Sequence, residues 1–256
     1  MNKKGGFNKS GQITIFIILA VIIVAGGVIL YFIFPEATTG FGVSTNNPNL
    51  YIQNCMEDEI ENNVDIISSQ GGSMNPENFI LYKDDKIDYL CYTSEFYVSC
   101  AMQQPLLKQH IEEEIKESIK DETDSCFNSL VEDFENQGYD VNLVRGKTTA
   151  EILPKRVEVT FENDLTLTKE NSERYEKIVV TVNKNIYELM SIANSILNME
   201  ARYGDSETTI YMNYYHDLKV EKLEQNDGST IYILTNRDTN EKFQFASRSV
   251  AFPPGI

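Results

Sequence analysis

Residues 47–72 read NPNLYIQNCMEDEIENNVDIISSQGG, and the architecture of the larger part of the chain can be built outward from them. Apolar residues recur here at steps of four, four, four and three, which places them on one face of a helix. They are Ile52, Met56, Ile60, Val64 and Ile67. Asn47 is a good N-cap, Pro48 fits the first turn, and Gly71-Gly72 can end the helix. We predict an amphipathic helix packed on a core.

A second helical region begins at Pro105. Its apolar stripe is Leu107, Ile111, Ile115, Ile119, Cys126, Leu130 and Phe134. The stripe is interrupted near residues 121–124, and Gly138 is expected to terminate the region.

From Thr148 the pattern changes to alternation, which is typical of strands. Alternating apolar residues are Val157, Val159, Phe161, Leu165, Leu167, Ile178, Val180 and Val182. Asn183 is expected to cap a helix that runs to about Tyr203, with Ile186, Met190, Ala193 and Leu197 facing inward. Further strands are predicted at 79–82, 87–90, 96–98, 208–214, 218–225, 230–235 and 242–248. Asn226-Asp227-Gly228 predicts a hairpin turn.

These patterns predict an α+β domain with mostly antiparallel sheet. We divide it into a helical, disulfide-linked part at 47–140 and a sheet-rich part at 141–256. Residues 35–46, rich in Thr and Gly, are expected to form a flexible stalk ahead of it.

Upstream of the stalk, residues 13–34 form an uncharged run. Sixteen of its 22 residues are Ile, Val, Leu or Phe. A helix of this length spans about 33 Å, enough to cross a bilayer core of about 30 Å. A buried core helix is the weaker alternative, and a cleaved secretory signal fits poorly because the run is long and lacks a small-x-small site.

Charge around the run predicts its orientation. Lys3, Lys4 and Lys9 precede it, Glu36 follows at once, and the next basic residue is Lys83. Positive charge stays on the cytoplasmic side. We therefore expect a cytoplasmic basic leader at 1–12, a single transmembrane helix that contacts membrane lipid, and an extracellular C-terminal domain at the cell membrane.

The leader residues Lys9-Ser10-Gly11-Gln12-Ile13-Thr14-Ile15-Phe16 resemble the leaders of archaeal class III prepilins, which are type IV pilin-like. The resemblance implies a leader-peptidase site between Gly11 and Gln12. The family usually has Glu at the fifth mature position, where this chain has Phe16. That carboxylate helps to align pilin subunits in a filament. Both cleavage of the leader and polymerisation therefore depend on whether Phe16 can take the place of this Glu.

A second resemblance covers most of the chain and rests on the order of short segments. They are Tyr51 to Cys55, Gln70-Gly71-Gly72, Ser125-Cys126, Gln137-Gly138-Tyr139 and Phe243-Gln244-Phe245-Ala246. They are similar to segments of uncharacterised membrane-anchored surface proteins of small-genome archaea. This family implies an architecture and a lineage, and it implies no activity.

The four cysteines all follow the apolar run. An even number in an extracytoplasmic domain predicts disulfides. Three pairings are possible, and we favour two specific bonds. Cys91–Cys100 would close a ten-residue hairpin-like loop, and Cys55–Cys126 would tie two helices together. No Cys-x-x-Cys pair is present, so we expect no metal site.

Net charge is −17, from 39 acidic and 22 basic residues. Such a field repels nucleic acid, which we exclude as a partner. It suits a solvated surface, cation screening or a basic partner. The only Asn-x-Ser/Thr sequon, at Asn8, precedes the apolar run.

Candidate chemistry in the sequence is sparse. His110 and His216, the only histidines, are each better explained by packing or surface roles than by catalysis, although His216 neighbours Asp217. Asp84 and Asp85 with Asp88 form at best a weak cation site. The acidic runs at 112–114 and 121–124 do not converge, because successive helical residues point in different directions. Tyrosines 211, 214 and 215 favour packing over ligand binding.

No hydrolase, nucleotide or zinc-protease motif is present, and we expect no enzyme and no cofactor. The sequence favours a structural or interaction protein at the cell surface, a pilin-like envelope component with a protein partner or self-association. The alternative is a membrane-tethered protein that binds a ligand or assists secreted proteins. Filaments or leader cleavage would favour the first function, and a convergent polar pocket would favour the second.

Overall fold

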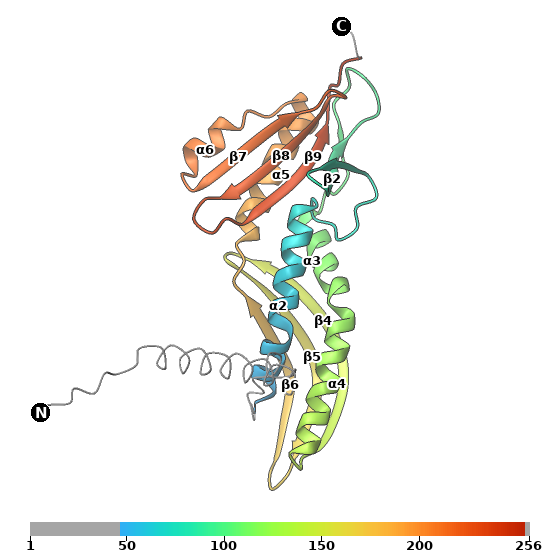
Figure 1. Ribbon diagram of the computed structural model, residues 1–256, viewed down its shortest axis with the longest axis vertical. Helices are drawn as coiled ribbons and strands as arrows, with labels where there is room; N and C mark the ends of the chain where they lie inside the picture. The colour runs from blue at the N-terminus through green and yellow to red at the C-terminus, as the bar shows by residue number, and fades with distance from the viewer. Residues whose placement is uncertain (1–46, 254–256) are drawn as a thin grey trace, which may run out of the picture. The chain divides into compact units, whose positions relative to one another are not determined.

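The computed structural model describes residues 47–253 (Figure 1). From Asn47 onward these residues form one compact unit. The expected leader, transmembrane segment and stalk lie outside the described residues. None of the helices within 47–253 is long and apolar enough to cross a membrane. The described part is a mixed α+β fold, as the sequence predicts, with helices and mostly antiparallel sheet.

Helix α2, Pro48–Ser69, is the amphipathic helix predicted from residues 47–72. The side chain of Asn47 accepts a hydrogen bond from the Asn49 backbone N–H at 2.9 Å, which caps the first turn. All five residues of the predicted stripe are buried. Gly71 follows with φ of 83°, a left-handed conformation that suits glycine, and a Cβ there would meet the Cβ of Asp88 at 2.9 Å.

Helices α3, Leu107–Ser118, and α4, Lys120–Asn136, form the second helical region. The predicted break exists, but it lies at Ile119, and residues 121–124 belong to the first turns of α4. Ile119 keeps its side chain in the core while the chain turns. Gly138, with φ of 85°, ends the region as expected.

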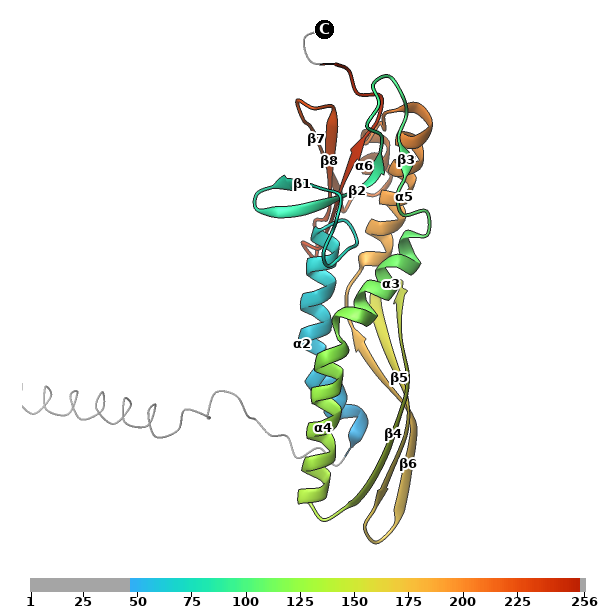
Figure 2. The ribbon, with the colours of Figure 1, turned by 90° about the vertical axis from the view of Figure 1, so that its right-hand side faces the viewer.

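A three-stranded antiparallel sheet lies beside these helices, in the order β4, β5, β6. Its strands are β4, Asp140–Leu153; β5, Arg156–Thr168; and β6, Ser172–Val182. Figure 2 shows α2 and α4 along one face of the sheet. The alternating residues predicted for β5 are all buried on that face, together with Asn163, because a strand directs every second side chain to the same side.

A second sheet has the order β1, β2, β9, β8, β7, with β3 paired to β2. Its strands are β1, Phe79–Tyr82; β2, Asp85–Tyr92; β3, Ala101–Met102; β7, Leu218–Glu224; β8, Ser229–Asn236; and β9, Lys242–Arg248. Only the β2–β9 pair is parallel among the described strands. Helix α5, Ile186–Tyr203, packs on this sheet. The predicted hairpin turn joins β7 and β8 at Gly228, with φ of 82°.

Two predicted strands are wrong. Residues 96–98 lie in the loop between β2 and β3, where Tyr97 has φ of 61° and cannot continue a strand. Residues 208–214 contain the short helix α6, Thr209–Tyr214, in place of a strand. Its β-branched and aromatic residues favour a strand locally, but Tyr211 bonds through its hydroxyl to Ser195 of α5, so tertiary contacts override that preference.

Three boundaries also differ from the prediction. Strand β4 begins at Asp140, eight residues before Thr148. Strand β2 extends beyond 87–90 at both ends. Helix α5 begins at Ile186 with Asn185 at the capping position, because β6 continues to Val182 and leaves Asn183 in the connection.

Both disulfides expected in the domain are present. Cys55 of α2 bonds to Cys126 of α4, with Cα atoms 6.0 Å apart, and Cys91 of β2 bonds to Cys100, with Cα atoms 5.3 Å apart. This is the pairing that the sequence favoured. The first bond ties two helices, and the second closes the loop between β2 and β3.

The two disulfides close loops of very different length, with separations of 71 and 9 residues. Chain entropy predicts upper stabilisations of about 4.4 and 2.7 kcal/mol respectively. We therefore expect the double variant Cys55→Ser/Cys126→Ser to unfold at lower urea concentration than Cys91→Ser/Cys100→Ser. The measurement is equilibrium unfolding followed by circular dichroism. The reverse order would show that local strain or residual unfolded structure outweighs loop length.

Candidate functional site

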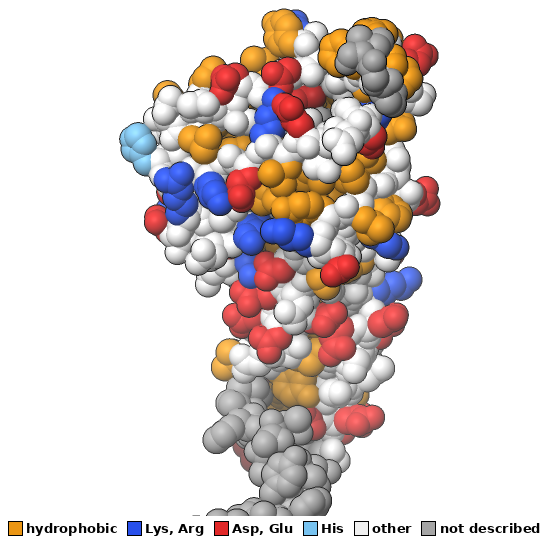
Figure 3. Space-filling view, turned by 45° about the horizontal axis from the view of Figure 1, so that its top comes forward, with side chains coloured by type: hydrophobic (Ala, Val, Ile, Leu, Met, Phe, Trp, Pro, Cys, Tyr) orange, Lys and Arg blue, Asp and Glu red, His pale blue; other side chains and the backbone are white. Residues whose placement is uncertain are grey.

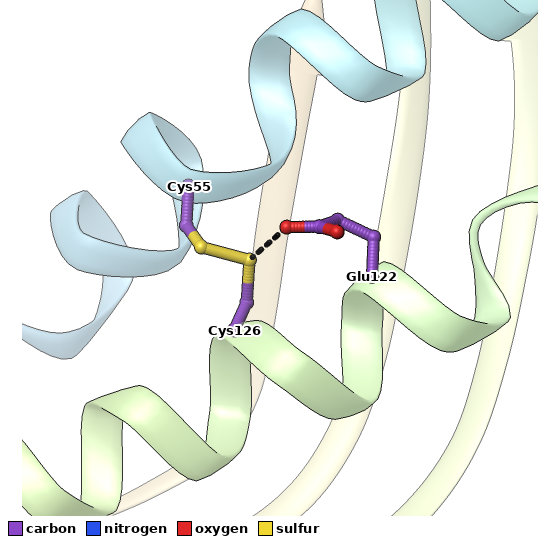
Figure 4. Close-up of side chains that lie close together, drawn as sticks. All are labelled: Cys55, Glu122 and Cys126. Carbon is purple, nitrogen blue, oxygen red and sulfur yellow. Dashed lines mark hydrogen bonds between the residues drawn. A yellow bond between two sulfur atoms is a disulfide. The ribbon is translucent and has the colours of Figure 1, made fainter. Parts of the chain in front are cut away.

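The Cys55–Cys126 disulfide lies beside a carboxylate (Figure 4). Ligand atoms of Cys55, Glu122 and Cys126 all lie within 4.8 Å of one another, the one such group of metal-ligating types among residues 47–253. The Oε1 of Glu122 is 3.7 Å from the Sγ of Cys126. A disulfide sulfur carries no proton, so this is a contact and not a hydrogen bond. Metal binding needs thiolates, and the oxidised pair supplies none.

A polar cluster forms where the chain leaves α2. The buried hydroxyl of Ser73 donates to Oδ2 of Asp88 on β2 at 2.9 Å. The same hydroxyl lies 2.9 Å from Nε2 of His110 on α3. Ser73 gives its single proton to Asp88, so the network assigns the second bond to an Nε2–H of His110 as donor.

The order of these three groups differs from that of a catalytic triad. In a triad, histidine lies between the hydroxyl and the carboxylate and takes the hydroxyl proton. Here the hydroxyl lies in the middle and its proton already points to Asp88. Burial raises the pKa of Asp88, and the Ser73 hydrogen bond opposes that rise. The cluster therefore ties a loop, a strand and a helix together.

A cavity of about 360 Å³ opens beside this cluster. Glu114 of α3 lies on its wall and accepts a hydrogen bond from the Met74 backbone N–H at 2.7 Å. His110 takes part in this network through Ser73, a partner that the sequence alone does not reveal. Their separation of 37 residues leaves no local signal.

The other candidate residues do not converge. Asp84 is exposed in the β1–β2 turn and Asp85 is exposed at the start of β2, while Asp88 is buried with Ser73. The weak cation site is therefore not assembled. His216 is exposed, and its backbone carbonyl, not its ring, accepts a hydrogen bond from Arg237. Asp217 instead accepts from Asn236 at 3.4 Å.

The acidic runs diverge as predicted. Glu112 accepts hydrogen bonds from Lys108 and from the Ile152 backbone, Glu113 pairs with Lys116, and Glu114 turns to Met74. The tyrosine expectation fails in part, because the Tyr214 side chain is 82% exposed on α6 and stacks edge-on with Tyr215 at 5.6 Å.

Figure 3 shows exposed apolar side chains on the part of the molecule that holds the β1–β2–β9–β8–β7 sheet. The large ones in this sheet, its helices and their loops are Leu81, Phe96, Tyr97, Val98, Met199, Tyr203, Ile210, Tyr214, Tyr215 and Phe252. Among them, Tyr97 packs against Phe252 and Tyr214 packs against Tyr215. Aromatic residues are enriched in protein interfaces, so these two exposed pairs are candidate interaction sites.

A buried carboxylate, Glu200, was not identified from the sequence. It lies on the core face of α5 and is only 2% exposed. Its Oε1 accepts from the hydroxyl of Tyr232, and its Oε2 accepts from Ser247 at 3.0 Å. Its spacing from Ile196 and Ala193 matches the buried stripe of α5, and this is the signal that could have found it.

Burial has the largest effect on the pKa values of Glu200 and Tyr232. It raises the pKa of Glu200, although the hydrogen bonds from Tyr232 and Ser247 act in the opposite direction. The pKa of Tyr232 is raised by its own burial and then by the neighbouring Glu200. The cluster joins α5 to β8 and β9, and it is a structural anchor.

Comparison with known proteins finds no matching family model, no matching curated protein and no matching solved structure.

Glu200→Gln tests the raised pKa. The folded state holds the proton more tightly than the unfolded state, so Glu200 costs stability as pH rises above the usual glutamate pKa of about 4.3. Glutamine can still accept from Tyr232 and can donate to Ser247. We expect the variant to gain free energy of unfolding relative to wild type between pH 4 and 7.

Urea unfolding at several pH values measures this difference. The control variant is Glu135→Gln, which also removes one carboxylate but from an exposed position on α4. The raised pKa of Glu200 would be contradicted if the free energy of unfolding of the wild type increased relative to that of Glu200→Gln as pH rises.

Proposed function

We propose that this chain is a single-pass membrane protein whose extracellular domain has a structural or interaction role. The apolar run at 13–34 anchors the protein, the lysine-rich leader stays in the cytoplasm, and the domain from Asn47 onward faces outward. The observation that carries this proposal is the pair of disulfides in the described domain. Disulfides persist in oxidising compartments and are rare in the cytosol.

The surface of the domain supports an interaction role. Helix α6 presents Ile210 and Tyr214 to solvent, and Tyr215, which directly follows the helix, is also exposed. A cluster of exposed aromatic and aliphatic side chains is typical of surfaces that bind another protein. The partner is a second protein or another copy of the chain, and the acidic field disfavours nucleic acid.

The leader supports a pilin-like component of the cell envelope. Gly11 and Gln12 occupy the cleavage positions of the archaeal class III prepilin pattern, and the wider resemblance is to membrane-anchored proteins of small-genome archaea. Phe16 removes the usual carboxylate and keeps the segment apolar. We propose that the chain remains in the membrane even where its leader is cut.

A membrane-tethered binding protein is the second candidate. The observation that favours it is a cavity of about 440 Å³ between the helices and the three-stranded sheet. Cavities of roughly 300–1,000 Å³ are the size of small-molecule sites.

The membrane topology can be tested directly. We expect protease added to intact cells to digest the domain from residue 36 onward and to spare a tag on the N-terminus. Detergent-permeabilised cells, in which both ends become accessible, serve as the control. Full protection of the domain in intact cells would overturn the proposed orientation.

Leader processing gives a separate test. N-terminal sequencing of protein from native membranes should find Gln12 as the first residue if the peptidase accepts this leader, and the protein should remain in the membrane fraction. Phe16→Glu introduces the residue that is usual in class III prepilins. Comparing this variant with the wild type tests whether Phe16 affects polymerisation. Sheared filaments containing the wild-type chain would show that Phe16 does not prevent assembly.

A further inference from the structure

The 440 Å³ cavity lies where the α3–α4 junction faces β4. Its lining carries four basic side chains: Lys116, Lys120, Arg145 and Lys147. Lys116 lies in the last turn of α3, and Lys120 begins α4 directly after the break at Ile119. Arg145 and Lys147 come from the middle of β4. Three elements, α3, α4 and β4, thus direct positive charge to one cavity.

A β-bulge places Arg145 at this cavity. On one side Arg145 lies opposite Asn163, and on the other Thr148 lies opposite Phe161. Two residues of β4, Gly146 and Lys147, therefore oppose the single residue Glu162. Asn163 and Phe161 are both on the buried face of β5. Without the extra residue, Arg145 would lie opposite Asp164 and point to the other face.

Glycine is required within the bulge. A Cβ at Gly146 would lie 2.5 Å from the backbone oxygen of Glu162, a distance that real Cβ atoms do not show. The close approach of the two backbones therefore depends on the missing side chain.

Packing fixes the guanidinium of Arg145. It lies over the ring of Phe127 on α4, 5.0 Å from the centroid, and pairs with Asp124 at 2.6 Å. Phe127 in turn packs edge-on against Phe161 at 5.5 Å, beneath the cavity. A cation held by a ring and a carboxylate is already oriented before any ligand arrives.

Two of the four cations are paired with carboxylates. Lys116 pairs with Glu113, which lies outside the lining, and with Glu117 at 3.3 Å, while Arg145 pairs with Asp124. Lys120 and Lys147 form no salt bridge with any residue of the described part. The lining therefore has an excess of positive charge, in a chain whose net charge is −17. Clustered like charges repel one another unless an anion offsets them.

We propose that this cavity binds a small anion with at least two negative charges, either a phosphate group or a pair of carboxylates. The bulge orients Arg145, whose fork of donors matches both chemistries, while Lys120 and Lys147 supply point charges. The cavity is too small for a macromolecular surface, and the acidic surroundings exclude extended polyanions while leaving a local site for a compact one. The site is independent of filament formation and of membrane orientation.

The test uses full-length protein in non-ionic detergent at low ionic strength, because salt screens such a site. Isothermal titration calorimetry with inorganic phosphate and with citrate separates the two chemistries. The pocket variant is Lys120→Gln/Lys147→Gln. In the wild type both lysine side chains are exposed and form no salt bridge within the described residues. The control is Lys83→Gln/Lys86→Gln, which removes the same charge from exposed positions on the β1–β2 hairpin.

We expect saturable binding of at least one anion by wild type, with affinity lowered at least about tenfold in the pocket variant and unchanged in the control. Binding of phosphate alone assigns a phosphate site, and binding of citrate alone assigns a carboxylate site. The proposal is overturned if neither anion binds, or if both variants lose affinity equally, since an equal loss indicates a general charge effect. The topology experiment does not depend on this outcome.

Discussion

The fold depends on the burial of one apolar stripe, that of helix α2. Its five stripe residues are almost fully buried, and each is expected to contribute roughly 1.5–3 kcal/mol relative to exposure. The helix contacts β6 of one sheet and β9 of the other, and it also packs on α3 and α4. Removing this face from water therefore draws both sheets into a single core, which explains why the two halves expected from the sequence form one compact unit.

Helices and strands whose apolar residues recur at a regular spacing could be predicted from the sequence. Elements whose conformation is fixed by tertiary contacts could not. Helices α2 and α5 and strand β5 each bury a regular set of side chains, so their faces were correct. Helix α6 has no buried residue, and its composition favours a strand. Polar clusters were missed for a related reason, since Ser73 meets His110 only after α2, β2 and α3 have packed together.

The late predicted start of β4 and the basic cavity have the same physical origin. Residues on the sheet's buried face are Val141, Leu143 and Arg145 before the bulge, and Thr148, Ala150 and Ile152 after it. Odd-numbered residues occupy this face before the bulge, and even-numbered residues occupy it after the bulge. A search for one continuous alternation therefore misses the first half of the strand. The bulge also brings Arg145 to the side of the sheet that α4 covers. An irregularity that obscures a strand in sequence can therefore mark the place where a site is built.

The cavity also connects to the disulfide between helices. Cys126 and Phe127 are neighbours on α4, so the bond to Cys55 restrains the helix that supports Arg145. A ligand site loses affinity when binding must first order its walls, and a covalent tie between α2 and α4 reduces that cost. Phe127 transmits the restraint, because it is fully buried between the helix and Phe161 of the sheet. The same bond that stabilises the helical layer thus also holds one wall of the basic cavity in position.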